Sequence, residues 1–189
     1  YALLNYDGIL FCNELFPINK TKAAKYFKKA AIKGNQNAMI YYGQMLLNGI
    51  GLSINKKEAI KFFKMAANKG NENALNYLGE MYYKGDYVQI NKEKAAAYFK
   101  KSADLGNENS ILFYSSMLKN GDGVKKNKKE ALKNYKLLAD KGNIHAMIFY
   151  SELLIDIGNP EDKIEAVRYI KMAADNGNVD SMYLYGDYL

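Results

Sequence analysis

The stretch Met65-Ala66-Ala67-Asn68-Lys69-Gly70-Asn71-Glu72-Asn73-Ala74 decides the fold, because it contains the end of one helix and the start of the next. Gly70 suits the left-handed backbone that often ends a helix, and Asn71 begins the following one. Five Gly-Asn pairs recur in register, beginning at positions 34, 70, 106, 142 and 177, at spacings of 36, 36, 36 and 35 residues. A fixed period of this length predicts an array of helical repeats.

Other positions keep the same register along the chain. The column that places small residues early in the first helix of each repeat contains Ala2, Ala38, Ala74, Ser110, Ala146 and Ser181. A second column contains Asp7, Gly43, Gly79, Ser115, Ser151 and Gly186. We expect helix backbones to approach each other closely at these columns, with slightly wider packing where Asp or Ser replaces Gly.

Each repeat is predicted to contain two helices, A and B. In residues 37–72, helix A runs from about Asn37 to Asn48, a glycine-containing loop follows, and Asn55 caps a helix B that ends at Lys69. Asparagine recurs at this capping position as Asn19, Asn55, Asn91 and Asn127. We expect one domain, 1–189, with units at about 1–36, 37–72, 73–108, 109–144 and 145–179 and a partial unit at 180–189.

The repeat resembles the Sel-one-like repeat, a relative of the tetratricopeptide repeat. The residues that carry the match in the second unit are Ala38, Gly43, Gly49, Gly51, Ala59, Phe62, Phe63, Ala66, Ala67 and Gly70. The resemblance implies an all-α, right-handed α-solenoid of antiparallel helix pairs, here five pairs plus a terminal half-repeat. It also implies a scaffold for protein complexes, although a fold does not specify a partner.

Composition favours a protein partner over a nucleic acid. Residues 1–141 carry 24 lysines against 12 acidic residues, whereas residues 142–189 carry three basic and eight acidic residues. Arg168 is the only arginine, and nucleic-acid readers use arginine for bidentate contacts. No apolar run is long enough for a membrane span, and the single cysteine, Cys12, favours a reducing, cytoplasmic compartment.

No residue set predicts catalysis, a cofactor or a metal. His145 and Cys12 are separated by more than three repeats, and packed helices advance by roughly 10 Å per repeat, so the two cannot form a nucleophile and base. One histidine and one cysteine do not supply a transition-metal site. The loop glycines lack the Lys-Ser/Thr of a phosphate-binding loop, so Gly49, Gly51, Gly121 and Gly123 are interpreted as turn residues.

The two helices of a repeat differ in charge. Lysines concentrate in the B helices, and in related solenoids the A helices line the concave face, so the expected groove is neutral to acidic. Transfer of the tetratricopeptide groove positions by resemblance selects candidate partner-binding residues, which are Ile40, Gln44, Asn73, Asn76, Glu80, Tyr83, Asn109, Leu112, Ser116, His145, Ile148 and Glu152. Asn73 and Asn109 would either clamp a peptide backbone or solvate helix starts.

The sequence therefore predicts a non-catalytic adaptor that binds a peptide or partner helix on its concave face. A second hypothesis is a regulatory or targeting repeat region of a larger enzyme or multi-subunit complex, since Tyr1 is not Met and Leu189 ends within a repeat. A third is a basic platform for RNA or an anionic membrane, through the lysines of the B helices.

Overall fold

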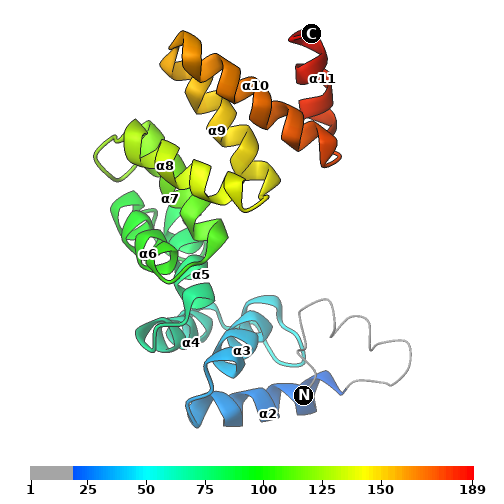
Figure 1. Cartoon of the computed structure of the whole chain (residues 1–189). Coiled ribbons are helices and arrows are strands. Elements are labelled where there is room, and N and C mark those ends of the chain that lie inside the picture. The colour runs from blue at the N-terminus through cyan, green and yellow to red at the C-terminus, as the bar shows by residue number, and fades with distance from the viewer. Residues whose placement is uncertain (1–18) are drawn as a thin grey trace. The chain divides into compact units, whose positions relative to one another are not determined.

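The computed structural model describes residues 19–189, and this part of the chain is helical without a strand (Figure 1). It contains ten helices: α2 (Lys20–Ile32), α3 (Gln36–Asn48), α4 (Lys56–Asn68), α5 (Glu72–Lys84), α6 (Lys92–Asp104), α7 (Glu108–Asn120), α8 (Lys128–Asp140), α9 (Ile144–Ile157), α10 (Pro160–Asp175) and α11 (Val179–Asp187). The predicted all-α repeat architecture is confirmed.

Helices A and B alternate as the period predicts. The A helices are α3, α5, α7, α9 and α11, and the B helices are α2, α4, α6, α8 and α10. The predicted helix of residues 37–48 begins one residue earlier, at Gln36. The first predicted helix A, its loop at 13–18 and Cys12 lie outside the described residues.

Asparagine caps begin almost every helix, because the amide oxygen accepts a free N–H of the first turn. Asn19, Asn55, Asn91 and Asn127 accept at 2.9, 3.0, 2.7 and 3.1 Å from the backbone N–H three residues later. The asparagines of the Gly-Asn pairs cap the A helices in the same way, at 2.8 to 3.0 Å. At α10, Pro160 occupies the first turn, and Asn159 makes no side-chain cap bond.

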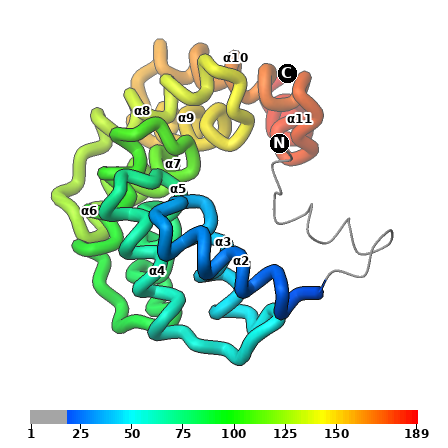
Figure 2. Tube along the Cα trace, turned by 90° about the horizontal axis from the view of Figure 1, so that it is seen from below, coloured from blue at the N-terminus to red at the C-terminus, as the bar shows by residue number. Residues whose placement is uncertain are grey.

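The chain divides into two compact units, Tyr1–Ala74 and Leu75–Leu189. In the first unit, α3 packs against both α2 and α4 (Figure 2). Its core contains Met39 from α3 and Phe63 from α4, which are 1% and 0% exposed. The apolar residues of α3 are therefore covered from two sides, as expected for the middle helix of three.

In the second unit, each helix from α6 to α11 packs against its neighbours in sequence. A core cluster joins α8, α9 and α10 through side chains such as Tyr135, Met147, Leu153 and Tyr169. The A helices α7 and α9 both contribute side chains to that core or pack against it, which holds them rigidly.

Small residues occur where another helix or loop approaches closely. A Cβ added at Gly43 would lie 3.0 Å from the ring of Phe63, and one at Gly79 would lie 2.8 Å from Phe99. In the loops, Gly51 and Gly123 have φ of +72° and +70°, and an added Cβ would overlap the backbone at Lys20 and Lys92 respectively. The interpretation of these glycines as turn residues is confirmed, with the addition that two of them seat a loop on the helix B of the preceding repeat.

Candidate partner-binding surface

The candidate residues form a stripe along each A helix because they follow the capping asparagine by two, five, nine and, once, twelve residues. The structure assigns three of them, Ile40, Gln44 and Asn73, to the first unit and the other nine to the second. The burial of the side chains differs along the stripe. Ile40 and Asn76 are buried, whereas Asn73, Asn109 and His145 are exposed.

Asn76 belongs to a buried polar cluster, so its amide is already occupied. Ser110 Oγ donates to Asn76 Oδ1 at 2.7 Å, and Asn76 Nδ2 donates to Glu80 at 2.8 Å. Ser110 Oγ also lies 2.7 Å from Ser102 Oγ. Ser110 has one hydroxyl proton, which Asn76 receives, so Ser102 donates in the second contact.

The sequence contained a signal for this cluster that the groove assignment missed. Asn76 stands in the column of Ile40, Leu112 and Ile148, and Ser102 stands in the column of Ala66, Leu138 and Ala173. Ser110 likewise stands where four other repeats have alanine. Asn76 and Ser102 lie in the unit 73–108, and Ser110 lies at the start of the next unit. Three polar exceptions in two consecutive repeats indicate mutual hydrogen bonding, because buried polar groups require partners.

Tyr83 links successive repeats of the second unit. Its hydroxyl donates to Asp122 Oδ2 at 3.0 Å, while Lys92 Nζ lies 2.6 Å from Asp122 Oδ1 and 5.5 Å from the centre of the Tyr83 ring. The hydrogen bond from Lys92 lowers the pKa of the Asp122 carboxyl, and the hydrogen bond to Asp122 raises the pKa of the Tyr83 phenol. The side chain of Tyr83 is therefore engaged in holding the loop after α7.

The remaining candidates on α7 and α9 form a common surface, which we call the helix-A surface and define as Asn109, Leu112, Ser116, His145, Ile148 and Glu152. Leu112 and Ile148 are half-buried and pack on the core cluster. Two polar contacts tie the helices together: Asn143 Nδ2 donates to Glu108 at 3.2 Å, and Lys119 Nζ lies 4.0 Å from Glu152. The surface therefore combines two partly exposed aliphatic side chains with exposed polar ones.

The helix-A surface offers groups for noncovalent contacts. Partly exposed Leu112 and Ile148 can bury apolar groups of a ligand, and Asn109, His145 and Glu152 can donate or accept hydrogen bonds at its edges. Within residues 19–189, no group of three or more His, Cys, Asp and Glu side chains lies close enough to hold a metal ion. In the same range, no helix has both the length and the apolar character to cross a membrane.

The B helices carry a second recurring arrangement, a lysine held between a tyrosine and a glutamate. Lys28 Nζ lies 5.6 Å from the centre of the Tyr42 ring and 3.4 Å from Glu58, and Lys136 Nζ lies 5.6 Å from the Tyr150 ring. Lys136 also lies 2.6 Å from Glu165. This hydrogen bond raises the pKa of Lys136 and lowers that of Glu165. These pairs join the B helices of consecutive repeats within each unit.

The fold defines the chain as a helical repeat protein built from alternating A and B helices. A model of the Sel1 repeat matches residues 2–35, 36–71, 73–107, 109–143 and 144–178. The chain therefore belongs to the Sel1 repeat family. Sel1 repeat proteins generally act as scaffolds for protein interactions and are typically non-catalytic.

Solved structures agree with this assignment. A Sel1 repeat protein from Oxalobacter formigenes matches with a TM-score of 0.73 and 28% identity over 86% of this chain and 67% of its own. A protective antigen of uropathogenic Escherichia coli with the same repeat fold has a TM-score of 0.51 and 22% identity, and it is matched over 95% of this chain and 47% of its own. A Sel1 repeat protein from Klebsiella pneumoniae has a TM-score of 0.55 and 17% identity over 86% and 79%. No curated protein sequence matches the chain.

Proposed function

We propose that the chain is a non-catalytic adaptor that binds a peptide or a partner helix on its concave face, with the helix-A surface of α7 and α9 as part of the contact. The observation that carries the proposal is the match of five Sel1 repeats, because proteins with this repeat generally act as interaction scaffolds. The array acts in this proposal as a single domain. Protein is the proposed partner, and no cofactor enters the proposal.

The character of the helix-A surface supports this function. A peptide ligand needs apolar contact area flanked by groups that can pair with its backbone, and the surface offers both. Leu112 and Ile148 are held by the core beneath them, so little ordering would accompany binding. Asn109 and His145 stand in the first turns of α7 and α9 and are exposed.

The test compares two double variants with equal changes of charge. Asn109→Glu/His145→Glu adds two negative charges at exposed first-turn positions, where acids favour the helix. Lys101→Gln/Lys163→Gln removes two positive charges from exposed positions of α6 and α10. Affinity purification with quantitative mass spectrometry should recover the same proteins with the wild type and the lysine variant, and fewer with the helix-A variant.

The melting temperature of each variant is measured in parallel to confirm the fold. Equal recovery of every partner by both variants would contradict the proposed surface. Recovery of no protein by the wild type, together with turnover of a substrate, would contradict the adaptor function itself. Glu80 and Tyr83 are left unchanged, because each already bonds within the chain.

A further inference from the structure

The first unit carries an excess of positive charge that packing of its helices does not require. Residues 19–74 contain eleven lysines and two glutamates, a net charge of +9. Helix α3 contains no charged residue, so the lysines lie on α2, on α4 and in the segments that follow these two helices. Positive charge is thus concentrated on the two B helices of this unit.

A groove of about 540 Å³ lies between α2 and α4, which we call the α2–α4 groove. Its apolar part is formed by Ile32 from α2 and by Phe62 and Met65 from α4. Its polar part is formed by Lys28, Lys57, Lys61, Asn55 and Glu58. The groove therefore joins an apolar strip to a rim on which lysine predominates.

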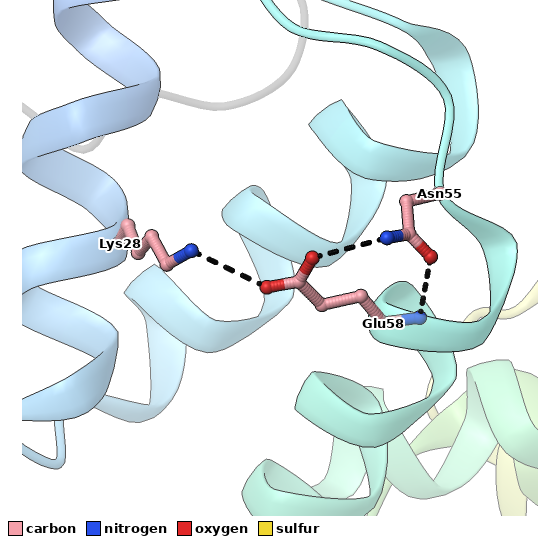
Figure 3. A network of polar contacts seen from close by, with 3 residues as sticks. All are labelled: Lys28, Asn55 and Glu58. Atoms are coloured by element: carbon pink, nitrogen blue, oxygen red, sulfur yellow. Dashed lines mark hydrogen bonds and ion pairs between the residues drawn. The ribbon is translucent and has the colours of Figure 1, made fainter.

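The one acidic residue of the groove is engaged by its own neighbours. Lys28 Nζ lies 3.4 Å from Glu58 Oε1, and Asn55 Nδ2 donates to Glu58 Oε2 at 3.2 Å (Figure 3). Within residues 19–189, neither Lys57 nor Lys61 forms an ion pair, and both are exposed. Two rim lysines are thus available to a ligand with negative charge.

Ile32 is the strongest sign of a ligand. It is 66% exposed, and the equivalent positions of the other four repeats carry Asn68, Asp104, Asp140 and Asp175. In two of those repeats the acid neutralises the lysine four residues earlier, at 3.0 Å for Lys100–Asp104 and 2.7 Å for Lys171–Asp175. In the first unit an exposed aliphatic side chain replaces that acid, at a position where the repeat fold accepts a polar residue.

We propose that the α2–α4 groove binds an acidic peptide segment of a partner protein that inserts a bulky aliphatic or aromatic side chain between Ile32, Phe62 and Met65. The carboxylates of the segment pair with Lys57 and Lys61. Phe62, the aromatic member of the strip, is only 6% exposed, whereas the aliphatic Ile32 is 66% exposed. The strip therefore favours a peptide over RNA, which is recognised by phosphate contacts and base stacking. The α2–α4 groove is concave, which favours a peptide over a membrane surface as the ligand. This site lies on B helices and is independent of the helix-A surface.

The experiment selects short random peptides displayed on phage against the full chain. We expect enriched peptides to carry several Asp or Glu and at least one Leu, Ile, Phe or Met. Ile32→Asn, which introduces the residue found at the same place in α4, should weaken a selected peptide about tenfold without lowering the melting temperature. Lys57→Gln/Lys61→Gln should weaken binding and reduce its dependence on salt.

The matched control is Lys22→Gln/Lys25→Gln, which removes the same charge from exposed positions of α2 outside the groove. It should weaken binding less than Lys57→Gln/Lys61→Gln does, because neither Lys22 nor Lys25 lines the groove. Asn109→Glu/His145→Glu should leave peptide binding to the α2–α4 groove unchanged. The experiment can therefore refute the α2–α4 groove without refuting the proposed adaptor function, and the reverse also holds.

Three results would overturn the proposal. The first is selection of no peptide, and the second is selection of peptides whose binding survives Ile32→Asn. The third is tighter binding of a single-stranded RNA or of phosphatidylserine vesicles that is lost in Lys57→Gln/Lys61→Gln and retained in Ile32→Asn. That third pattern would assign the lysines to an anionic surface without a peptide groove.

Discussion

Two serines of α7 provide a sharp test of how buried polar groups act in this repeat. Ser110 and Ser115 are both 0% exposed, yet their hydroxyl groups differ in partners. Ser110 Oγ has two oxygen neighbours at 2.7 Å, in Asn76 and Ser102. Ser115 Oγ has no hydrogen-bond partner within the described part of the chain. Truncation to alanine should therefore change stability in opposite directions.

Ser110→Ala should lower the free energy of unfolding by about 2.5 kcal/mol. Each lost hydrogen bond contributes roughly 1 kcal/mol, and Asn76 Oδ1 is left buried without a donor, at a further cost of about 1 kcal/mol. The better helix propensity of alanine returns about 0.5 kcal/mol. No steric cost arises, because Ala38, Ala74 and Ala146 occupy this position in other repeats.

Ser115→Ala should instead raise the free energy of unfolding by about 1 kcal/mol. The substitution removes a buried hydroxyl that gains nothing in the folded state, and alanine favours the helix. Ser151 occupies the equivalent position, and its Oγ donates to the Met147 carbonyl at 2.7 Å. Ser151→Ala is therefore a control, in which the loss of that bond should offset most of the gain.

The assay is urea denaturation of the full chain followed by far-ultraviolet circular dichroism. Any separate transitions of the two units are fitted individually, since repeat arrays can unfold in steps. The triple variant Asn76→Ile/Ser102→Ala/Ser110→Ala carries apolar residues from the same columns as Ile40, Ala66 and Ala38. It should recover most of the stability that Ser110→Ala loses, because no polar group remains unpaired. Equal effects of Ser110→Ala and Ser115→Ala, or additive losses in the triple variant, would refute this reasoning.

Three further predictions concern single residues of the second unit. Gly123→Ala should destabilise the protein by more than about 2 kcal/mol, since it combines a left-handed backbone with overlap at Lys92, and urea titration measures the loss. Tyr87 occupies the same loop position with φ of +68°, so Tyr87→Gly should raise stability in the same assay by about 1 kcal/mol. The hydrogen bond with Lys92 lowers the pKa of Asp122 in the folded state. The ionised carboxyl therefore stabilises the fold fully above the ordinary aspartate pKa of about 3.9, and this stabilisation is lost as pH falls through the lowered pKa. Asp122→Asn should therefore reduce the loss of stability between about pH 5 and pH 2, measured by thermal unfolding across that range.

The controls for these variants come from the chain itself. Gly106→Ala shares the positive φ but leaves the added Cβ in open space, so it should cost less than Gly123→Ala. A Tyr87→Gly variant no more stable than Tyr87→Ala would show that the left-handed backbone carries little strain. Asp86→Asn, at an exposed loop position, should leave the pH dependence intact. If Asp122→Asn lost as much stability as the wild type between about pH 5 and pH 2, other carboxylates would account for the pH dependence.

The local features of the fold were predictable from the sequence. Helix starts, helix ends and the two-helix period follow from asparagine, glycine and alanine at fixed spacing, because capping and left-handed turns involve residues only a few positions apart. Gly43 and Gly79 were also predictable as contact points, since a repeat places the same helix over each of them. The assignment of these positions to helix A or helix B required no knowledge of partners.

The candidate surface was less predictable. Asn76 and Tyr83 occupy stripe positions of an A helix, yet Asn76 is buried beside Ser110, and Tyr83 reaches Asp122 in the next repeat. The spacing of a stripe specifies only the side of its own helix on which a residue lies. The burial of that residue depends on which side chains of the adjacent helices lie against it.

The sequence by itself determined that this protein is an array of paired helices with basic B helices, because these properties reside in periodicity and composition. Only the tertiary structure decided which polar side chains satisfy one another and which remain for a ligand. Ile32 and Ser110 illustrate the difference. Each breaks the pattern of its column, but one is exposed beside Lys28 at a groove and the other is enclosed between Asn76 and Ser102. The physical reason is that solvation depends on neighbours brought together from different helices, which no local pattern records.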